Sequence, residues 1–293
     1  MTIRWHQTDP VPVILSAPEC LGRRVLVFAP HPDDEIFGCG GTLCLLTKAG
    51  ADVSIVIISD GALGGSAAHL IEIREAESRS AASVIGVPAP TFWRLPDRGV
   101  AYGEALVTKM LAMIESVEAD LVFAPAISEI HPDHQAVSLA AAEAIRRLGG
   151  ERRLAFYEIS APLVPNTIVD ISTVETIKRQ SMNCFHSQLT EQPYAERIAA
   201  LNRYRAYLLG PGKMAAEAFF MTVATELDHG FLPPSQLQEK VNFLERELVE
   251  ARLQRDIADR RLQAAFSSAS WTCTKPLRLI KRFATRLMGR SQT

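Results

Sequence analysis

Residues 24–35, RVLVFAPHPDDE, decide how this chain folds. Their first half is an apolar run without polar alternation, which is typical of a strand buried on both faces of a sheet. Similar runs alternate with amphipathic stretches, and this alternation predicts a parallel sheet covered by helices. The expected strands are 24–29, 53–59, 91–95, 121–124, 155–159, 167–170 and 219–225, and the expected helices are 40–49, 69–85, 104–117, 135–148, about 173–185 and 194–208. The predicted fold class is therefore α/β, a Rossmann-like three-layer sandwich with a mostly parallel sheet.

The overall composition excludes several classes of protein. Of the 293 residues, 47% are hydrophobic and the formal net charge is −2, so the chain can bury a sizeable core and has no general attraction for nucleic acid. No apolar run approaches the roughly 18 residues that span a bilayer, and the first dozen residues do not resemble a signal peptide. Five cysteines without CxxC spacing indicate a reducing compartment, so we expect a cytoplasmic protein.

The composition changes after Pro233-Pro234, where we place a domain boundary. Residues 1–232 form the predicted catalytic domain. Residues 233–266 carry four weak heptads, which predict a helical extension: either a coiled coil that can join copies of the chain or a packed amphipathic helix. Residues 267–293 contain six basic and no acidic residues. This basic tail is either a helix on an anionic membrane surface, at the inner face of the membrane, or a disordered segment.

Two short polar motifs each follow a predicted buried strand. HPDDE, residues 31–35, comes almost directly after the first strand, and HPDH, residues 131–134, follows the strand at 121–124. Because ligands bind at the carboxyl ends of parallel strands, we expect both motifs at one site. His131 and His134 can point into that site together, since residues three apart share a helix face. Three imidazole or carboxylate ligands with one open position form a catalytic zinc site, which is the chemistry that these motifs predict.

The paired PHPDDE and HPDH motifs resemble those of the PIG-L/LmbE-like zinc N-deacetylases over roughly residues 22–225. Members of that family act on N-acetylglucosamine groups in glycolipids, thiol conjugates and antibiotics. The resemblance implies that His31, Asp34 and His134 hold one zinc ion, that Asp33 is the general base, that His131 stabilises the oxyanion and assists the leaving amine, and that Arg74, Asp97 and His186 contact the sugar. Some members have a tyrosine two residues before the second motif, where this chain has Glu129.

Each of these residues also has a structural interpretation. The two aspartates of the first motif can cap a helix N-terminus, and Asp133 is expected to cap the helix that follows it. Arg74 can be a solvated side chain paired with a neighbouring glutamate on its own helix. Asp97 can be a turn residue, and His186 can end a helix. Glu35 is expected to be a capping or supporting residue outside the metal set.

The predicted function is removal of the N-acetyl group from an N-acetylglucosamine-type amino sugar in glycan or glycoconjugate biosynthesis, with one Zn²⁺ or another divalent ion per chain. Residues 270–278, SWTCTKPLR, look like an element found near bacterial glycosyltransferases of surface-polysaccharide assembly, which favours a glycan or a lipid-linked sugar as substrate. A nucleotide-linked sugar is a further candidate substrate. Two alternatives remain. One is a metal-dependent amidase that cleaves a larger acyl group from an amino-sugar conjugate. The other is a non-catalytic scaffold for polysaccharide assembly with a vestigial metal site.

Overall fold

A computed structural model describes residues 14–15, 17, 21–227, 252, 254–255, 257–258 and 260. The chain divides into two units, Met1–Leu232 and Pro233–Thr293, and each is considered by itself. The six described residues of the second unit are helical and exposed. The heptads predicted for 233–266 lie otherwise outside the described residues, as does the whole basic tail predicted for 267–293.

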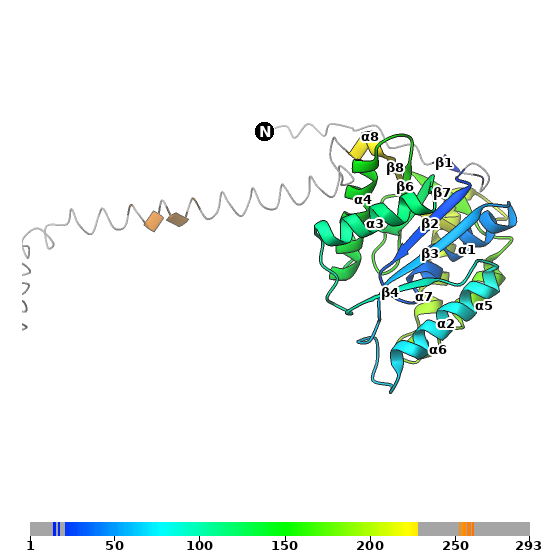
Figure 1. Cartoon of the computed structure of the whole chain (residues 1–293). Coiled ribbons are helices and arrows are strands. Elements are labelled where there is room, and N and C mark those ends of the chain that lie inside the picture. The colour runs from blue at the N-terminus through cyan, green and yellow to red at the C-terminus, as the bar shows by residue number, and fades with distance from the viewer. Residues whose placement is uncertain are drawn as a thin grey trace, which may run out of the picture. The chain divides into compact units, whose positions relative to one another are not determined.

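One sheet of eight strands organises the described part of the first unit (Figure 1). Its order is β1-β7-β8-β6-β5-β2-β3-β4. The strands are β1 (Ile14–Leu15), β2 (Arg24–Ala29), β3 (Asp52–Ser59), β4 (Thr91–Leu95), β5 (Leu121–Pro125), β6 (Arg153–Tyr157), β7 (Thr167–Asp170) and β8 (Ala216–Val223). All neighbours pair in parallel except β8, which is antiparallel to β6 and β7. A mostly parallel sheet is thereby confirmed.

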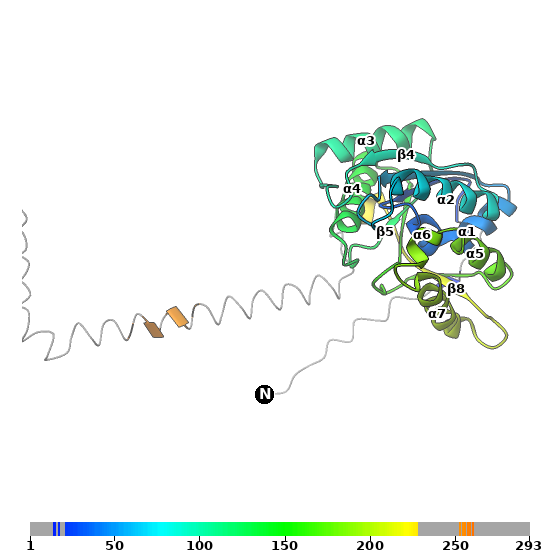
Figure 2. The same ribbon diagram turned by 90° about the horizontal axis from the view of Figure 1, so that it is seen from below.

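Helices cover both faces of this sheet. They are α1 (Asp34–Lys48), α2 (Leu70–Ile85), α3 (Glu104–Ser116), α4 (Pro132–Leu148), α5 (Glu175–Met182), α6 (His186–Leu189), α7 (Tyr194–Ala206), the 3₁₀ turn η2 (Tyr207–Leu209) and α8 (Ala224–Leu227). Figure 2 shows α3 and α4 on one side of the sheet, with α1, α2 and α5 on the other. The expected three-layer α/β arrangement is therefore present.

The alternation of side chains along β2 explains the two separate cores. Val25, Val27 and Ala29 belong to the cluster that packs beneath α1, α2 and α5. Leu26 and Phe28 point to the opposite face and join the cluster beneath α3 and α4. Because successive side chains in a strand face opposite sides, a strand buried on both faces must be apolar throughout. This is the pattern from which the strand was predicted.

The first helix begins six residues earlier than its predicted start at residue 40. Three glycines between residues 38 and 41 argue against a helix by propensity. In the structure they allow close packing instead. A Cβ on Gly38 would lie 2.2 Å from a ring carbon of Tyr157, and a Cβ on Gly41 would lie 2.9 Å from Ile171. Tertiary packing therefore requires glycine at positions that remain helical.

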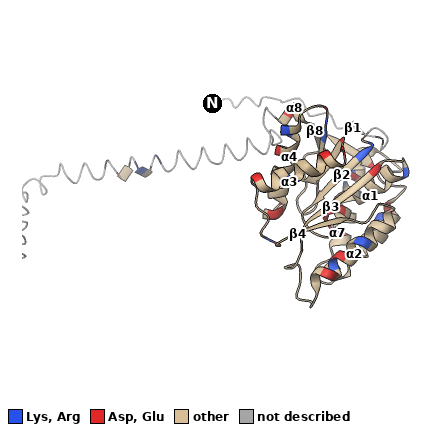
Figure 3. Cartoon of the chain, in the orientation of Figure 1, with Lys and Arg blue, Asp and Glu red and all other residues tan. Residues whose placement is uncertain are grey.

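Charged residues lie mainly on the helices and at the ends of the strands. Figure 3 shows basic and acidic residues interspersed along α2, while the middle of the sheet carries neither. Among the described residues, no helix combines the length and the apolar character needed to cross a membrane.

The strand order brings the two polar motifs together. β2 and β5 are parallel neighbours, with Val27 paired to Phe123. Successive strands run away from this pair in opposite directions, through β3 and β4 on one side and β6 on the other. Such a point of reversal leaves a crevice at the carboxyl ends of the strands. The loops that follow β2 and β5 both begin there, and they carry residues 31–35 and 131–134.

Candidate metal centre and active site

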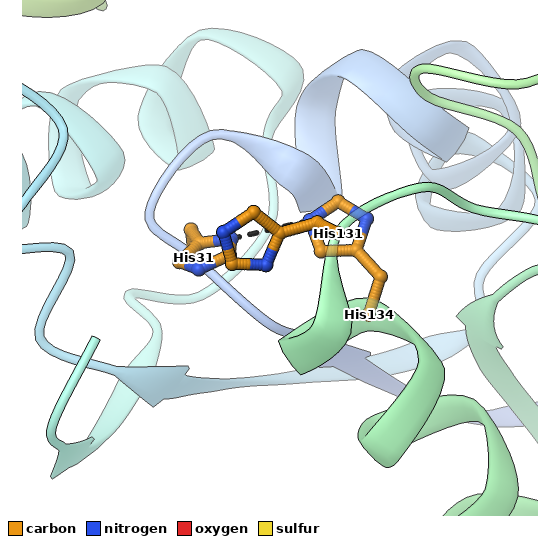
Figure 4. A group of neighbouring side chains, drawn as sticks. All are labelled: His31, His131 and His134. Carbon is orange, nitrogen blue, oxygen red and sulfur yellow. Dashed lines mark hydrogen bonds between the residues drawn. The ribbon is translucent and has the colours of Figure 1, made fainter. Parts of the chain in front are cut away.

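Three donor atoms from the two motifs form a nearly equilateral triangle. His31 Nδ1 lies 3.2 Å from Asp34 Oδ2 and 3.2 Å from His134 Nε2, and the Asp34 and His134 atoms are themselves 3.2 Å apart. All three side chains are buried. Figure 4 shows His31 reaching from the loop after β2 toward the start of α4, which carries His134.

This triangle has the dimensions of a metal site. A tetrahedral ion with ligand bonds of about 2.0–2.1 Å places its ligands about 3.3–3.4 Å apart. The donor set of two imidazoles and one carboxylate fits such an ion. A ring nitrogen of His131 also lies within 4.8 Å of donor atoms of His31 and His134, so the three histidines form a second, wider group. The residues around this point could therefore hold a divalent cation.

The charges of these three groups depend on one another. Burial raises the pKa of Asp34, but His134 and His31 outweigh it, so the pKa is lowered overall. Burial likewise disfavours the charged form of His134, yet Asp34 raises its pKa to about 9. The Asp34 carboxylate thus favours the protonated forms of the His31 and His134 rings. A metal ion would compete with those protons for the same ring nitrogens.

Two further carboxylates lie behind His31. Its Nε2 is 3.3 Å from Asp97 Oδ1 and 3.3 Å from Asp133 Oδ2. Asp97, which the resemblance assigns to the sugar, has a side chain that is only 5% exposed, and Oδ2 accepts a hydrogen bond from Leu63 N. Its position favours support of His31 over contact with a substrate, because a carboxylate behind a ligating histidine fixes the ring.

Asp133 does not cap α4, contrary to expectation. The N-cap is His131, whose Nδ1 accepts a hydrogen bond from Asp133 N at 3.2 Å. The Asp133 carboxylate instead accepts from Arg98 N at 2.7 Å and Val100 N at 3.2 Å. It therefore ties the loop after β4 to the same point at which it contacts His31.

His131 stands beside the triangle at the N-terminus of α4. Its ring centroid lies 4.6 Å from that of His31 and 5.3 Å from that of His134 (Figure 4). Burial, followed by the charges of the other two histidines, lowers the pKa of His131. Since Nδ1 accepts a hydrogen bond, the neutral ring carries its proton on Nε2. His131 is thus a hydrogen-bond donor within the cluster.

Asp33 adopts an unusual backbone conformation at the N-terminus of α1. Its φ is 136°, and its side chain makes no capping hydrogen bond, so the capping interpretation does not hold. Backbone strain of this kind occurs where neighbouring contacts enforce it. Burial raises the pKa of Asp33 to about 7, against the opposing charge of Arg74. The carboxyl group therefore titrates near neutrality.

Arg74 is a buried side chain on α2, so its interpretation as a solvated residue paired with a neighbouring glutamate is wrong. Its Nη2 donates to Pro32 O at 2.8 Å and lies 3.2 Å from Asp33 Oδ2. Its Nη1 donates to Gly61 O at 2.9 Å. Arg74 thus joins the loops after β2 and β3 and holds Asp33 between them.

Glu35 supports the same loop. It is fully buried, and its Oε2 accepts a hydrogen bond from Asp33 N at 3.0 Å. Burial raises the pKa of Glu35 to about 8, so its neutral form is present at neutral pH. This agrees with the expectation that it caps or supports the loop outside the metal set.

The stretch around α6 reaches the site through residues other than the predicted one. His186 is exposed at the start of α6. Gln188 is buried and donates to Gly64 O at 3.2 Å, beside Arg74. Tyr194 stacks on Phe37 with ring centroids 6.0 Å apart, and burial, then the charges of Asp33 and Asp34, raise its pKa. Gln188 lies in the HSQ stretch at 186–188, which is a weaker match to the family, whereas no motif marks Tyr194 in the sequence.

A large open cavity lies at the opposite edge of the sheet. Its volume is about 1070 Å³, and its lining includes Arg24, Asp120 and Arg153, which stand at the amino ends of β2, β5 and β6. None of the histidines or carboxylates described above lines it. In parallel sheets ligands bind at the carboxyl edge, so this cavity is not the candidate active site.

Comparison with known proteins identifies related chains. Residues 26–145 match the model of the PIG-L family, described as GlcNAc-PI de-N-acetylase. Diacetylchitobiose deacetylase of Thermococcus kodakarensis is 28% identical over 208 residues, which cover 60% of this chain and 76% of the relative. The "probable N-acetyl-alpha-D-glucosaminyl L-malate deacetylase 2" of Bacillus cereus is 26% identical over 185 residues, covering 57% of this chain and 84% of the relative.

A solved structure extends the comparison. The conserved protein TT1542 of Thermus thermophilus is 31% identical, with a TM-score of 0.62 over 67% of this chain and 93% of that chain. The region matched by the family model contains both motifs of the candidate site, and the two curated relatives named above are deacetylases. This chain therefore belongs to the PIG-L family.

Proposed function

We propose that this chain is a metal-dependent N-deacetylase that hydrolyses the acetamide of an N-acetylglucosamine-type amino sugar. The observation that carries the proposal is the 3.2 Å triangle of His31 Nδ1, Asp34 Oδ2 and His134 Nε2. We assign these three residues as the metal ligands, because their spacing fits a tetrahedral ion better than the wider group of three histidines does.

Zn²⁺ is the ion that this donor set favours, since two imidazoles and one carboxylate with an open position are typical of catalytic zinc. When bound, such an ion polarises a carbonyl oxygen and lowers the pKa of water. All other steps fall to the side chains of this chain. Asp97 and Asp133 hold the His31 ring from behind, each 3.3 Å from Nε2.

Asp33 is the proposed general base. It accepts a proton from the attacking water while the water oxygen bonds to the acetamide carbon, a role that contributes about 10²–10⁴-fold in rate. Arg74 holds the carboxylate in place through its 3.2 Å contact and its bonds to Pro32 O and Gly61 O. A carboxyl group with a pKa of about 7 is well matched to a base near neutral pH.

His131 is the proposed donor to the carbonyl oxygen. Its Nε2–H faces the developing negative charge, where a fixed donor is most effective. The bond between carbon and nitrogen then breaks, the amine nitrogen takes up the proton that Asp33 accepted, and acetate leaves. The water thus supplies one oxygen and one hydrogen to acetic acid, which ionises to acetate, and one hydrogen to the amine.

We infer the class of substrate from the substrates for which the relatives are named. Diacetylchitobiose and N-acetylglucosaminyl malate, named for two of them, share an N-acetylated glucosamine and differ in what it is attached to. We therefore propose the acetamido sugar as the common element of recognition. The origin of the sugar in glycan or glycoconjugate biosynthesis, and its link to a lipid or nucleotide, are parts of the same proposal.

A panel of N-acylated sugars tests this function. The zinc-loaded full chain is incubated with free, nucleotide-linked, lipid-linked and polymeric N-acetylhexosamines, and released acetate is measured. Matched N-butyryl and N-octanoyl glucosamines test the alternative of a larger acyl group. We expect acetate release from at least one N-acetyl sugar, and a loss of about 10²–10⁴-fold in Asp33→Asn. The proposal would be contradicted if the chain released only the longer acids, or if Asp33→Asn released acetate as fast as the wild type.

A further inference from the structure

Glu129 is a fully buried carboxylate two residues before the second motif. It lies on the loop between β5 and α4, the same loop that carries His131. Its Oε2 stands 3.5 Å from Nδ1 of His134, the ring nitrogen that faces away from the triangle. The side chain thus approaches a proposed metal ligand from behind, on the opposite side of the ring from Asp34.

The backbone after β6 holds this carboxylate in a single position. Its Oε1 accepts hydrogen bonds from Ile159 N at 2.7 Å and Ala161 N at 3.3 Å, and Ser160 N donates to both oxygens at 3.1 and 3.0 Å. Three successive backbone N–H groups form a concave site for an anion. Oε2 accepts only the bond from Ser160 N there, so it retains a lone pair for His134.

His134 Nδ1 needs such a partner. The atom is buried, and no atom of the described residues forms a hydrogen bond with it. A buried N–H group without an acceptor loses its bonds to water without replacement, which destabilises that protonation state of the ring. Oε2 of Glu129, at 3.5 Å, is just beyond ordinary hydrogen-bond distance from this atom and is its ion-pair partner among the described residues.

We propose that Glu129 is a positioning residue that keeps the proton of His134 on Nδ1 and thereby directs the Nε2 lone pair at the metal. This inference rests on the proposed function only through the assignment of His134 as a ligand. A carboxylate behind a ligating histidine fixes both its tautomer and its orientation. Glu129 therefore does for His134 what Asp97 and Asp133 do for His31.

The substitution Glu129→Gln separates this role from simple packing. Glutamine has the same shape, and its carbonyl oxygen can still accept from Ile159 N, Ser160 N and Ala161 N. Its amide then presents N–H to His134 Nδ1, which becomes an acceptor. The ring proton moves to Nε2, where it blocks the atom that binds the metal.

Glu158→Gln is a matched control. Glu158 is another buried carboxylate at the end of β6, which accepts from Leu163 N at 2.8 Å and pairs with Arg205. Among the described residues, its hydrogen-bond and ion-pair partners are Leu163 and Arg205, and no histidine is among them. Loss of a buried carboxylate next to the same loop should therefore destabilise the fold without weakening metal binding.

The experiment measures Zn²⁺ affinity of the full chain by competition with a chelator, and records ¹⁵N spectra of the zinc-loaded protein labelled at histidine. We expect Glu129→Gln to bind Zn²⁺ about 10–100-fold more weakly, and Glu158→Gln to match the wild type. The wild-type spectrum should show a protected Nδ1–H on His134. Wild-type affinity in Glu129→Gln, or zinc bound through Nδ1 in the wild type, would overturn the proposal.

The wild-type spectrum decides the question even when Glu129→Gln does not fold. The two proposals also fail separately. Weak binding in Glu129→Gln, together with no acetate release from any sugar by the wild type, would support the role of Glu129 and reject the deacetylase.

Discussion

Arg74 Nη2 lies 3.2 Å from Asp33 Oδ2, and both side chains are buried. The same guanidinium donates to Pro32 O and Gly61 O. One arginine therefore contacts the strained residue, its own loop after β2 and the neighbouring loop after β3. Asp33 keeps its φ of 136° because these contacts surround it. The position of the proposed base is thus set from α2, a helix that contributes no ligand to the triangle.

We expect Arg74→Met to lower kcat for acetate release by about 100-fold with a smaller change in KM, because a shift of about 1 Å in a catalytic group has that effect. Arg79→Met is the control, since Arg79 lies on the same helix with a side chain that is 48% exposed. Steady-state kinetics of both variants provide the test. Equal kcat values in the two variants would show that Arg74 does not position the base.

A buried ion pair supports the helix that begins with Asp34. Lys178 Nζ donates to Glu217 Oε1 at 2.6 Å, to Asn202 Oδ1 at 3.0 Å and to Phe37 O at 3.0 Å. We expect Lys178→Met to lower the free energy of unfolding by about 3–5 kcal/mol, because Glu217 is left buried without its partner. Lys48→Met, at the exposed end of α1, should have little effect in urea unfolding.

The double variant Lys178→Met/Glu217→Gln tests the cause of that loss. Glutamine carries no charge and keeps one of the two acceptor oxygens, whereas in Glu217 Oε1 accepts from Gly41 N at 2.8 Å and Oε2 from Thr42 N at 2.7 Å. The double variant should be more stable than Lys178→Met alone. If it is less stable, lost packing and hydrogen bonding, and not an unpaired charge, explain the effect.

Gly38 should not accept a side chain. A Cβ there would lie 2.2 Å from the ring of Tyr157, which is fixed because its hydroxyl donates to Phe28 O at 2.9 Å. We expect Gly38→Ala to cost about 1–3 kcal/mol or more in thermal or urea unfolding. Gly103→Ala is the control, since nothing lies within 4 Å of its Cβ position. Similar stabilities would contradict the packing that explains the glycines of α1.

The C-terminal turn of α4 should contribute a pH-dependent increment of stability. Hydrogen bonds from Arg146 and then Arg147 lower the pKa of Glu143 from 4.5 to about 2. A carboxylate with a lowered folded pKa stabilises the protein above pH 4.5, and this effect is lost as pH falls toward 2. Because solvent screens the pair, we expect Glu143→Gln to cost only about 0.5 kcal/mol at pH 7.

Urea unfolding between pH 7 and 2 measures this difference. The gap between wild type and Glu143→Gln should close with acidification. Glu115→Gln on α3 serves as the control, because no ion pair in the described part of the chain involves it, and it should show no such trend. A gap that stays constant or widens toward pH 2 would contradict the assignment.

The sequence was sufficient to predict seven of the eight described strands, all but β1, and the shared location of the two motifs. β2, β4 and β7 have the predicted bounds. The start of α1 was not predictable from local preference. Its glycines are explained by Tyr157 and Glu217, residues more than a hundred positions away.

The surroundings of the motifs were harder to predict for the same reason. The partners of Arg74 are the carbonyls of Pro32 and Gly61, and carbonyl groups leave no signal in a sequence. Glu129 is held by the backbone at 159–161, so nothing around it in the sequence indicates that it turns inward. Supporting residues therefore become visible only when the fold brings distant segments together.

The number of zinc ions bound by the full chain tests the central claim most directly. Elemental analysis after reconstitution and dialysis should give about one Zn²⁺ per wild-type chain. His134→Ala removes one corner of the triangle and should bind far less. His69→Asn, which changes an exposed histidine on α2's N-cap, should bind as much as the wild type. Equal zinc contents in His134→Ala and wild type would contradict the account.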